Sequence, residues 1–150
     1  MENIFEVAKF FLEKEPMTHK KLQKMCYYAQ AWYLANHNVP LVPNRFEAWV
    51  HGPVSPDLYS HYKEWGWLPI TIKEDETFTF SKNTISHFLN LVYNVYGKYS
   101  GDELEAMTHQ EIPWKEARRG CLASDYCRNP ISQRTMMTYY GERLKKKNEN

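Results

Sequence analysis

The chain has 150 residues, which suits one domain with its own hydrophobic core. Its 19 basic residues balance 18 acidic ones, so the net charge of +1 gives no overall case for nucleic acid binding. The first residues lack the features of a signal peptide, and no apolar run approaches the ~20 residues of a membrane span. The three cysteines form no paired framework. We therefore expect a cytoplasmic protein with no membrane association.

Hydrophobic spacing predicts two helices in the N-terminal part of the chain. The first covers about residues 3–14 and ends before Pro16. Thr18 is placed to cap the second, which reaches about Asn36 and carries two adjacent apolar stripes. We expect a central helix packed on two sides. Its narrow polar face is expected to carry Lys20, Gln23, Lys24, Tyr27 and Gln30.

The middle of the chain favours short strands and one short helix. Apolar and polar residues alternate over residues 46–51, and Gly52-Pro53 is expected to turn the chain. Ser55 and Pro56 are typical of a helix start, and this helix should end at Gly66. Two weak strands are expected at residues 69–72 and 77–80, around an acidic turn at residues 74–76.

The C-terminal half again favours helices. A long helix should open at Ser81, and Ser100 with Glu103 has the spacing of a capping box. Pro113 should open a short helix. Residues 120–130 should form a loop, and Ser132 should cap the last helix.

The prediction is thus a mainly α, single-domain helical bundle with a small β-hairpin insertion at about residues 46–80. Residues 1–144 should form the domain, and residues 145–150 a solvated tail.

The residues indicate no catalytic site and no cofactor. Cys26 lies on an apolar stripe, where a buried thiol is the expected state. A zinc site is conceivable from four residues, but their spacing matches no known zinc motif: Cys121, Cys127, His51 and His109. No metal site is therefore predicted.

Two basic clusters flanked by aromatic residues raise the alternative of nucleic acid binding. They comprise Lys20, Lys21 and Lys24, and Lys115, Arg118 and Arg119. Solvated helix faces commonly have this composition, and acidic residues balance the whole chain, so this reading is not preferred.

Residues 49–59 form an unusually rigid segment with aromatic side chains. Gly52 and two prolines, Pro53 and Pro56, restrict the backbone around Trp49, His51 and Tyr59. Such a corner can be a scaffold, or it can present the aromatic anchors that binding sites use. The residues alone leave both possibilities open.

Four motifs together resemble the Panacea domain, the SocA-like antitoxin family. Residues 49–59 are similar to its W-x-x-G-P-V-x-P-x-L-Y signature. Residues 21–30 resemble its K-L-Q-K-L-L-Y-Y-A-Q helix, with Cys26 in place of a leucine. Residues 108–114 resemble its T-H-x-x-x-P-W element, and residues 131–140 its closing helix. The matches are in register over about residues 4–142.

The resemblance implies an antitoxin of a bacterial or prophage type II toxin–antitoxin system. Such antitoxins neutralise a cognate protein toxin, often one acting on translation or alarmone metabolism, by direct binding. The alternative is the adaptor role of the antitoxin that gives the family its name, which delivers its toxin to a protease. The candidate contact residues are Lys24, Tyr27, Trp49, His51 and Tyr59. The candidate supporting residues are Gly52, Pro53, Val54, Pro56, His109, Pro113 and Trp114.

Overall fold

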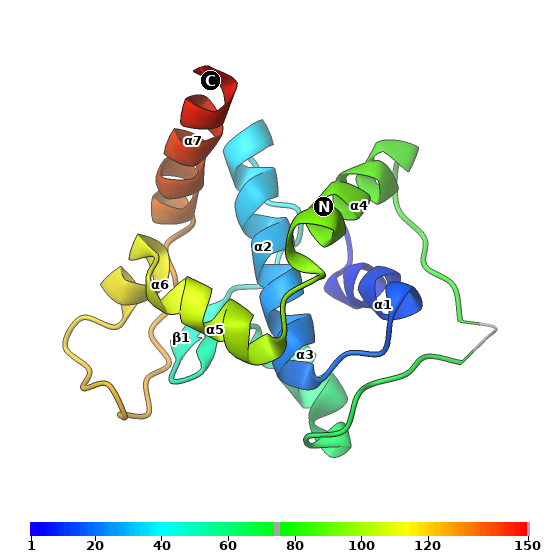
Figure 1. Ribbon diagram of the computed structural model, residues 1–150, viewed down its shortest axis with the longest axis horizontal. Helices are drawn as coiled ribbons and strands as arrows, with labels where there is room; N and C mark the ends of the chain where they lie inside the picture. Colours follow the sequence, from blue (N-terminus) through cyan, green and yellow to red (C-terminus); the bar gives the residue numbers. More distant parts are fainter. Residues whose placement is uncertain (74–75, 150) are drawn as a thin grey trace.

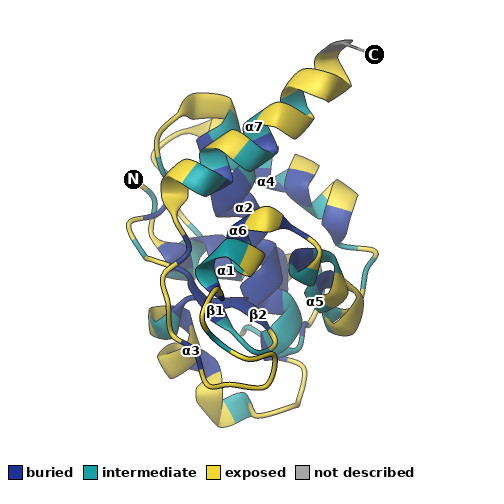
Figure 2. Cartoon of the chain, turned by 90° about the vertical axis from the view of Figure 1, so that its left-hand side faces the viewer, coloured by how far each residue is buried: buried dark blue, intermediate teal, exposed yellow. Residues whose placement is uncertain are grey.

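The computed structural model describes residues 1–73 and 76–149, and a long helix, α2 (His19–His37), runs through its middle (Figure 1). Most of α2 is buried (Figure 2). The elements packed against it are α1 (Ile4–Lys14), α3 (Pro56–Tyr62), α4 (Asn83–Tyr96), α5 (Gly101–His109), α7 (Gln133–Glu149) and β2 (Gly52–Val54). The expected central helix and mainly α fold are confirmed.

Short polar side chains define where the helices begin. The Thr18 hydroxyl accepts from Lys21 N and opens α2, and Ser55 accepts from Leu58 N at the start of α3. Ser100 and Glu103 form both bonds of the predicted capping box at the start of α5. Helix α2 ends at Asn38, whose φ of 59° places it in the left-handed region.

Most of the polar face of α2 is buried in the structure. Gln23, Lys24, Tyr27 and Gln30 are each at most 2% exposed. The Gln30 amide donates to Val42 O (2.9 Å) and accepts from Leu41 N (2.8 Å) and Val42 N (3.1 Å).

About two helical turns earlier on α2, the side chain of Gln23 bonds the backbone of Ser55 in the same way. Its amide donates to Ser55 O (3.2 Å) and accepts from Ser55 N (2.9 Å). The two glutamines lie seven residues apart on α2 and satisfy loop backbone groups that would otherwise be buried without partners.

The sheet among the described residues is a two-stranded hairpin of β1 (Glu47–Trp49) and β2. Trp49 pairs with Gly52, so Val50 and His51 form the turn, and the predicted turn at Gly52-Pro53 is wrong. Those two residues belong to β2 instead. The other edge of β1 is held by residues 129–131, through Ala48 N to Asn129 O and Ile131 N to Phe46 O.

The two weak strands predicted after α3 are also wrong. After α3 come a 3₁₀ turn, η1 (Lys63–Trp65), and an irregular segment in which Ile70 makes a single bridge to Met17. Phe78 packs edge-on against Phe10 of α1, so burial of aromatic rings, and not strand pairing, anchors residues 77–80. The expected acidic turn falls on residues 74–75, outside the described residues. The hairpin insertion is therefore confined to residues 47–54.

Two helix limits differ from those expected. Helix α4 begins at Asn83, with Lys82 at the capping position, because the Ser81 hydroxyl is engaged by Glu2. Helix α7 continues through Glu149, so the expected tail from residue 145 is helical, although residues 145–148 are exposed. None of the helices in the described ranges has the length and apolar character needed to cross a bilayer.

A buried carboxylate joins α7 to α2. Glu111, before the short helix α6 (Ile112–Ala117), is 3% exposed. It accepts from Tyr28 OH of α2 (2.8 Å) and Tyr140 OH of α7 (2.8 Å) through Oε1. Its second oxygen lies 2.9 Å from Arg143 Nη1. The Glu111 carboxylate thus has partners on both α2 and α7 and links the two helices.

Replacing Gln30 by alanine should destabilise the fold by about 3 kcal/mol, because three buried backbone groups of Leu41 and Val42 would lose their partner. Urea unfolding measures this loss. The control, Gln133→Ala, removes an exposed glutamine and should change stability by less than about 0.5 kcal/mol. Equal effects of the two substitutions would contradict the role given to Gln30.

Replacing Glu111 by alanine should lower stability by about 2–4 kcal/mol and loosen α7, because two buried hydroxyls and Arg143 lose their common acceptor. Limited proteolysis should then cut within α7 before the rest of the chain. Glu142→Ala, which removes an exposed carboxylate of α7, should leave the cleavage pattern unchanged.

Candidate partner-binding site

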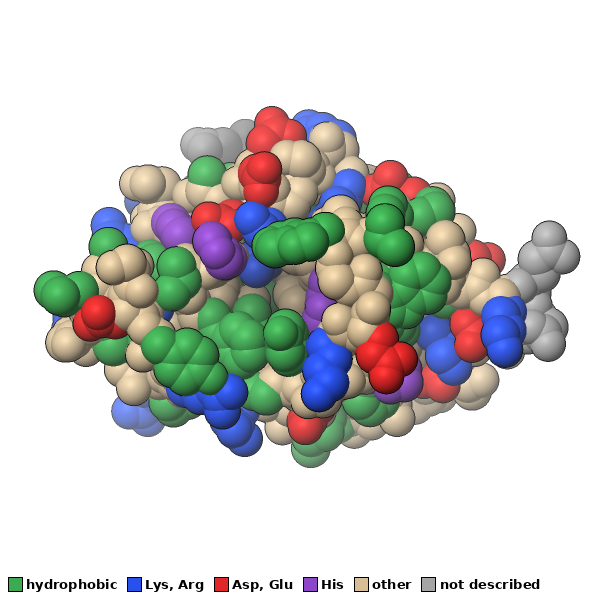
Figure 3. All heavy atoms as spheres, turned by 90° about the horizontal axis from the view of Figure 1, so that it is seen from below, with side chains coloured by type: hydrophobic (Ala, Val, Ile, Leu, Met, Phe, Trp, Pro, Cys, Tyr) green, Lys and Arg blue, Asp and Glu red, His purple; other side chains and the backbone are tan. Residues whose placement is uncertain are grey.

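A groove of about 550 Å³ opens beside the rigid corner. Its walls come from the first half of α2, the hairpin, the end of α3 with η1, and the start of α5. Aromatic side chains line it from three places in the sequence, Trp49, Tyr59 and Trp67. Seen from below, this side of the molecule has hydrophobic side chains gathered around a hollow, with histidine and basic side chains beside it (Figure 3).

Trp49 is held from several directions. Its indole Nε1 donates to Glu47 Oε1 (2.9 Å), and its carbonyl accepts from Trp114 Nε1 (2.9 Å). Its ring meets Tyr59 edge to face, with centroids 5.0 Å apart, and Arg128 lies over it. Little side-chain freedom remains to be lost if a partner packs against this ring.

Tyr59 stacks on a buried histidine of α2. The rings of Tyr59 and His19 are 5.3 Å apart and nearly parallel, while Tyr59 stays 42% exposed. Burial, with a smaller effect of the nearby Lys24 charge, lowers the pKa of His19 to about 4. The Gln23 amide nitrogen, 3.2 Å from His19 Nε2, can only donate, which also requires a neutral ring. His19 therefore presents an uncharged surface at neutral pH.

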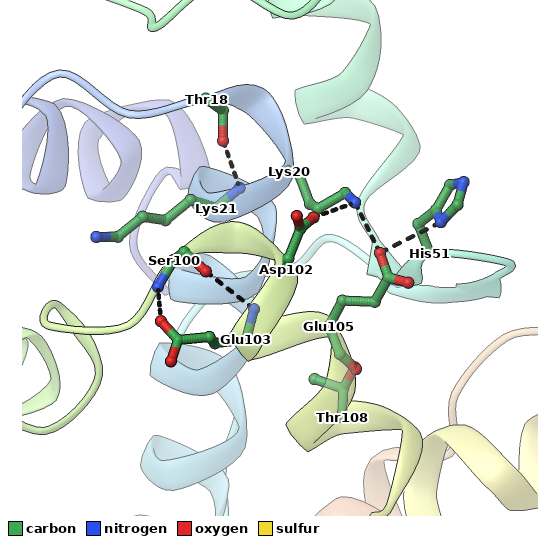
Figure 4. A network of polar contacts seen from close by, with 9 residues as sticks. All are labelled: Thr18, Lys20, Lys21, His51, Ser100, Asp102, Glu103, Glu105 and Thr108. Carbon is green, nitrogen blue, oxygen red and sulfur yellow. Dashed lines mark hydrogen bonds and ion pairs between the residues drawn. The ribbon is translucent and has the colours of Figure 1, made fainter.

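The rim beside α5 is an ion-pair network (Figure 4). Lys20 Nζ lies 2.8 Å from both Asp102 Oδ1 and Glu105 Oε1. His51 Nδ1 lies 3.2 Å from the same Glu105 oxygen. Partial burial opposes the charge on Lys20, but the bonds to the two carboxylates outweigh it and raise the pKa of Lys20. Lys20 is thus a satisfied cation.

Lys24, one turn further along α2, is in the opposite situation. It is 1% exposed and lines the groove, yet among the described residues its ammonium has neither a hydrogen bond nor an ion pair. Burial lowers the pKa of Lys24 to about 7, with the Glu105 charge opposing the shift and Lys20 adding to it.

Gly52 makes the room that Lys24 occupies. A Cβ at Gly52 would lie 2.6 Å from Lys24 Cε and 3.0 Å from Thr108 Oγ1. The φ of Gly52 is also +109°, which L-residues rarely adopt. The glycine of the motif is therefore required both by its backbone angle and by the lysine packed beneath it.

Four of the five predicted contact residues come together at this groove. Lys24, Trp49, His51 and Tyr59 line it. Tyr27 does not, because it is 1% exposed in the core, where its hydroxyl lies 3.1 Å from that of Tyr140. The helical spacing of polar and apolar residues could not reveal that Tyr27 is buried, since tyrosine suits both a polar face and a core.

The residues expected to support the corner surround it, although their role stays a prediction. Trp114 reaches Trp49 as described, and His109 stacks on Trp114 with centroids 3.9 Å apart. His109 Nε2 is buried without a partner among the described residues, and burial lowers its pKa. The other members are buried or half-buried: Gly52, Pro53, Val54, Pro56 and Pro113.

Two aromatic residues that line the groove, His19 and Trp67, are not among the residues predicted from the sequence. The available signal for Trp67 was a tryptophan directly after the expected helix end at Gly66, while its 83% exposure is known only from the structure.

The three cysteines lie in two different settings. Cys26 is buried, and burial raises the pKa of its thiol far above the normal range. Cys121 and Cys127 bring their sulfur atoms to 2.7 Å. The four residues considered for zinc do not assemble, since the described part of the chain contains no group of three or more potential metal ligands.

The Lys24 charge should make stability depend on pH. The pKa of Lys24 is lower in the folded than in the unfolded chain, so between these values only the unfolded chain holds the proton, and stability rises with pH. From pH 7 to pH 9 the free energy of unfolding should gain about 2 kcal/mol from Lys24.

Denaturant unfolding of wild type and Lys24→Met at both pH values measures this gain, which the variant should lack. Lys145→Met, which removes an exposed ammonium of α7, controls for the loss of one charge. The window avoids His19, which titrates lower, and Tyr27, Tyr28 and Tyr140, which burial shifts higher. The same pH dependence in wild type and Lys24→Met would contradict the assignment.

Comparison with known proteins agrees with the resemblance drawn from the motifs. The family described as antitoxin SocA-like, Panacea domain matches residues 22–115, which include the signature segment 49–59. Antitoxin SocA from Caulobacter vibrioides (strain NA1000 / CB15N) is 40% identical over 58 residues, 35% of this chain and 31% of the relative. The chain thus aligns with about a third of that relative's length. No solved structure matches the chain. Because the family match spans more than half of the sequence, the chain belongs to the antitoxin SocA-like, Panacea domain family.

Proposed function

We propose that this protein is an antitoxin that neutralises a cognate protein toxin by binding it directly at the groove beside the Trp49–Tyr59 corner. Family membership supports the antitoxin role. The observation that carries the choice of surface is the groove itself, which brings together three aromatic side chains, two of which, Trp49 and Tyr59, are held by neighbouring side chains. Aromatic anchors in a partly enclosed site are typical of energetically dominant contacts.

The arrangement favours protein binding over nucleic acid binding. The basic residues of α2 do not form a free cationic face, since Lys20 is paired with two acids and Lys24 is buried. Lys21 Nζ is bound by Glu15 and the Gly97 carbonyl. In the second basic cluster, Arg118 is 6% exposed and donates to the carbonyls of Ala48, Leu122 and Asp125. These cations hold the fold together, and phosphate contacts would have to break those bonds.

The proposed contact residues are Trp49, His51 and Tyr59 on the walls of the groove and Lys24 on its floor. Tyr27 supports them from the core, and His109 and Trp114 buttress the hairpin. The activity is binding in the cytoplasm and not catalysis. As the family suggests, the toxin would act on translation or on alarmones, within a type II system of bacterial or prophage origin.

Co-expression with the product of the neighbouring gene tests the proposal. Wild type should restore growth and form a stable complex. Tyr59→Ala removes a 42%-exposed ring and should weaken binding at least about tenfold, with a melting temperature within a few degrees of wild type. Trp49→Ala should do the same if its fold survives. Leu91→Ala, an exposed apolar residue of α4 outside the groove, is the matched control and should bind normally.

The outcomes separate direct neutralisation from the adaptor alternative. Rescue in a strain lacking the cytoplasmic ATP-dependent proteases supports direct neutralisation, and rescue that requires them supports the adaptor. A neighbouring product that is harmless alone, or stays toxic beside this protein, would refute the toxin–antitoxin assignment. Normal binding by both groove variants would refute the chosen surface.

A further inference from the structure

Among the described residues, the ammonium of Lys24 lacks a partner at the floor of a groove that also carries three large aromatic side chains. Lys20 and Lys21, on the same helix, are each bonded by two acceptors, and Lys24 by none among the described residues. A cation that is 1% exposed without an anion is unfavourable in the free protein. Such a group is typical of a site that a ligand completes.

The position of Lys24 is fixed and open to the groove. Its side chain packs against Gly52 of β2, and the Thr108 hydroxyl of α5 approaches the same glycine. It also lines the groove with Trp49, Tyr59 and Trp67. A partner group that enters the groove beside these rings would meet the ammonium, in surroundings where low polarity strengthens an ion pair.

We propose that the groove receives a segment of the partner protein in which a carboxylate side chain pairs with Lys24, while an adjacent apolar side chain packs against Trp49, Tyr59 and Trp67. This inference rests on the proposed function and specifies the chemistry of the toxin surface that is recognised.

Charge and size favour a carboxylate over a phosphate. Lys24 is the one buried ammonium of the groove without a partner among the described residues, since Lys20 is already shared by Asp102 and Glu105 and Lys63 is exposed to solvent. Asp102 also lines the rim, and its charge would repel the second charge of a phosphate. A volume of about 550 Å³ holds a few side chains, and three aromatic rings offer apolar contact beside a single charge.

The pairing should couple binding to protonation of Lys24. The charged or titratable groups around it are Glu105 and Lys20, which act on Lys24, and His19 and His109, on which Lys24 acts. The ion pair needs the protonated amine, and burial lowers the pKa of Lys24 to about 7 in the free protein. Affinity for the toxin should therefore fall up to about tenfold per pH unit above pH 8.

Calorimetry with the purified toxin and lysine-Cε NMR of the antitoxin test the inference together. Lys24→Met should bind at least 30-fold more weakly at pH 7 and lose the pH dependence of wild type. Lys145→Met, which removes an exposed lysine of α7 outside the groove, should change affinity by less than about threefold. In wild type, the Lys24 signal should titrate at least two pH units higher in the complex than alone.

An unchanged Lys24 titration on complex formation would overturn the proposal, as would normal binding by Lys24→Met when Tyr59→Ala fails to bind. Normal binding by Lys24→Met together with failed binding by Tyr59→Ala would mean that the toxin binds at the groove without placing a carboxylate on Lys24. If wild type does not bind the toxin, the proposed function fails, and small probes still test the groove. Phenylacetate should shift the Lys24 signal and neutral phenylacetamide should not; equal effects, or none from either, would refute a carboxylate site.

Discussion

Two buried glutamine amides on one helix are the constraint on which the rest of the structure depends. Gln23 and Gln30 lie on the same side of α2 and bond the backbone of Ser55 and of Leu41 and Val42. The chain between these points contains the hairpin and passes close to α2. Leu41, Val42 and Ser55 lie outside the strands of the hairpin, so the amides supply the partners that their buried backbone groups need. The hairpin and the corner take their positions from these two anchors.

The corner is consequently stiff, and the groove beside it is formed before any partner arrives. Trp49 is fixed by Glu47 and Trp114, and Tyr59 by His19. A preformed site loses little conformational entropy on binding. Lys24 differs from these residues, because an ammonium that is buried and has no partner among the described residues lowers the stability of the free protein. The same helix therefore combines satisfied polar groups that build the fold with one unsatisfied group that faces the groove.

Local patterns served well where local interactions decide the structure. The caps at Thr18, Ser55 and Ser100 depend on a side chain and a backbone group three residues away, so their spacing could be recognised directly. The hairpin turn could not, because Gly52 and Pro53 are common turn residues and their strand pairing with Trp49 and Ala48 depends on register. Residues 69–72 and 77–80 have strand-like composition, but in the described part of the chain Ile70 makes only a single bridge to Met17, and residues 77–80 are placed by aromatic packing on α1.

The sequence by itself determined the helical architecture, the central place of α2, the rigidity of residues 49–59 and the resemblance to an antitoxin family, because periodicity, capping and motif order are properties of the chain. Only the tertiary structure decided that Gln23 and Gln30 act as buried anchors, that Tyr27 belongs to the core, and that Lys24 lies at the base of a groove with Trp67, without a partner in the part of the chain that the structure describes. These outcomes depend on which distant segments cover each side chain. A polar residue on a helix looks the same in sequence whether water, a backbone carbonyl or an empty groove faces it.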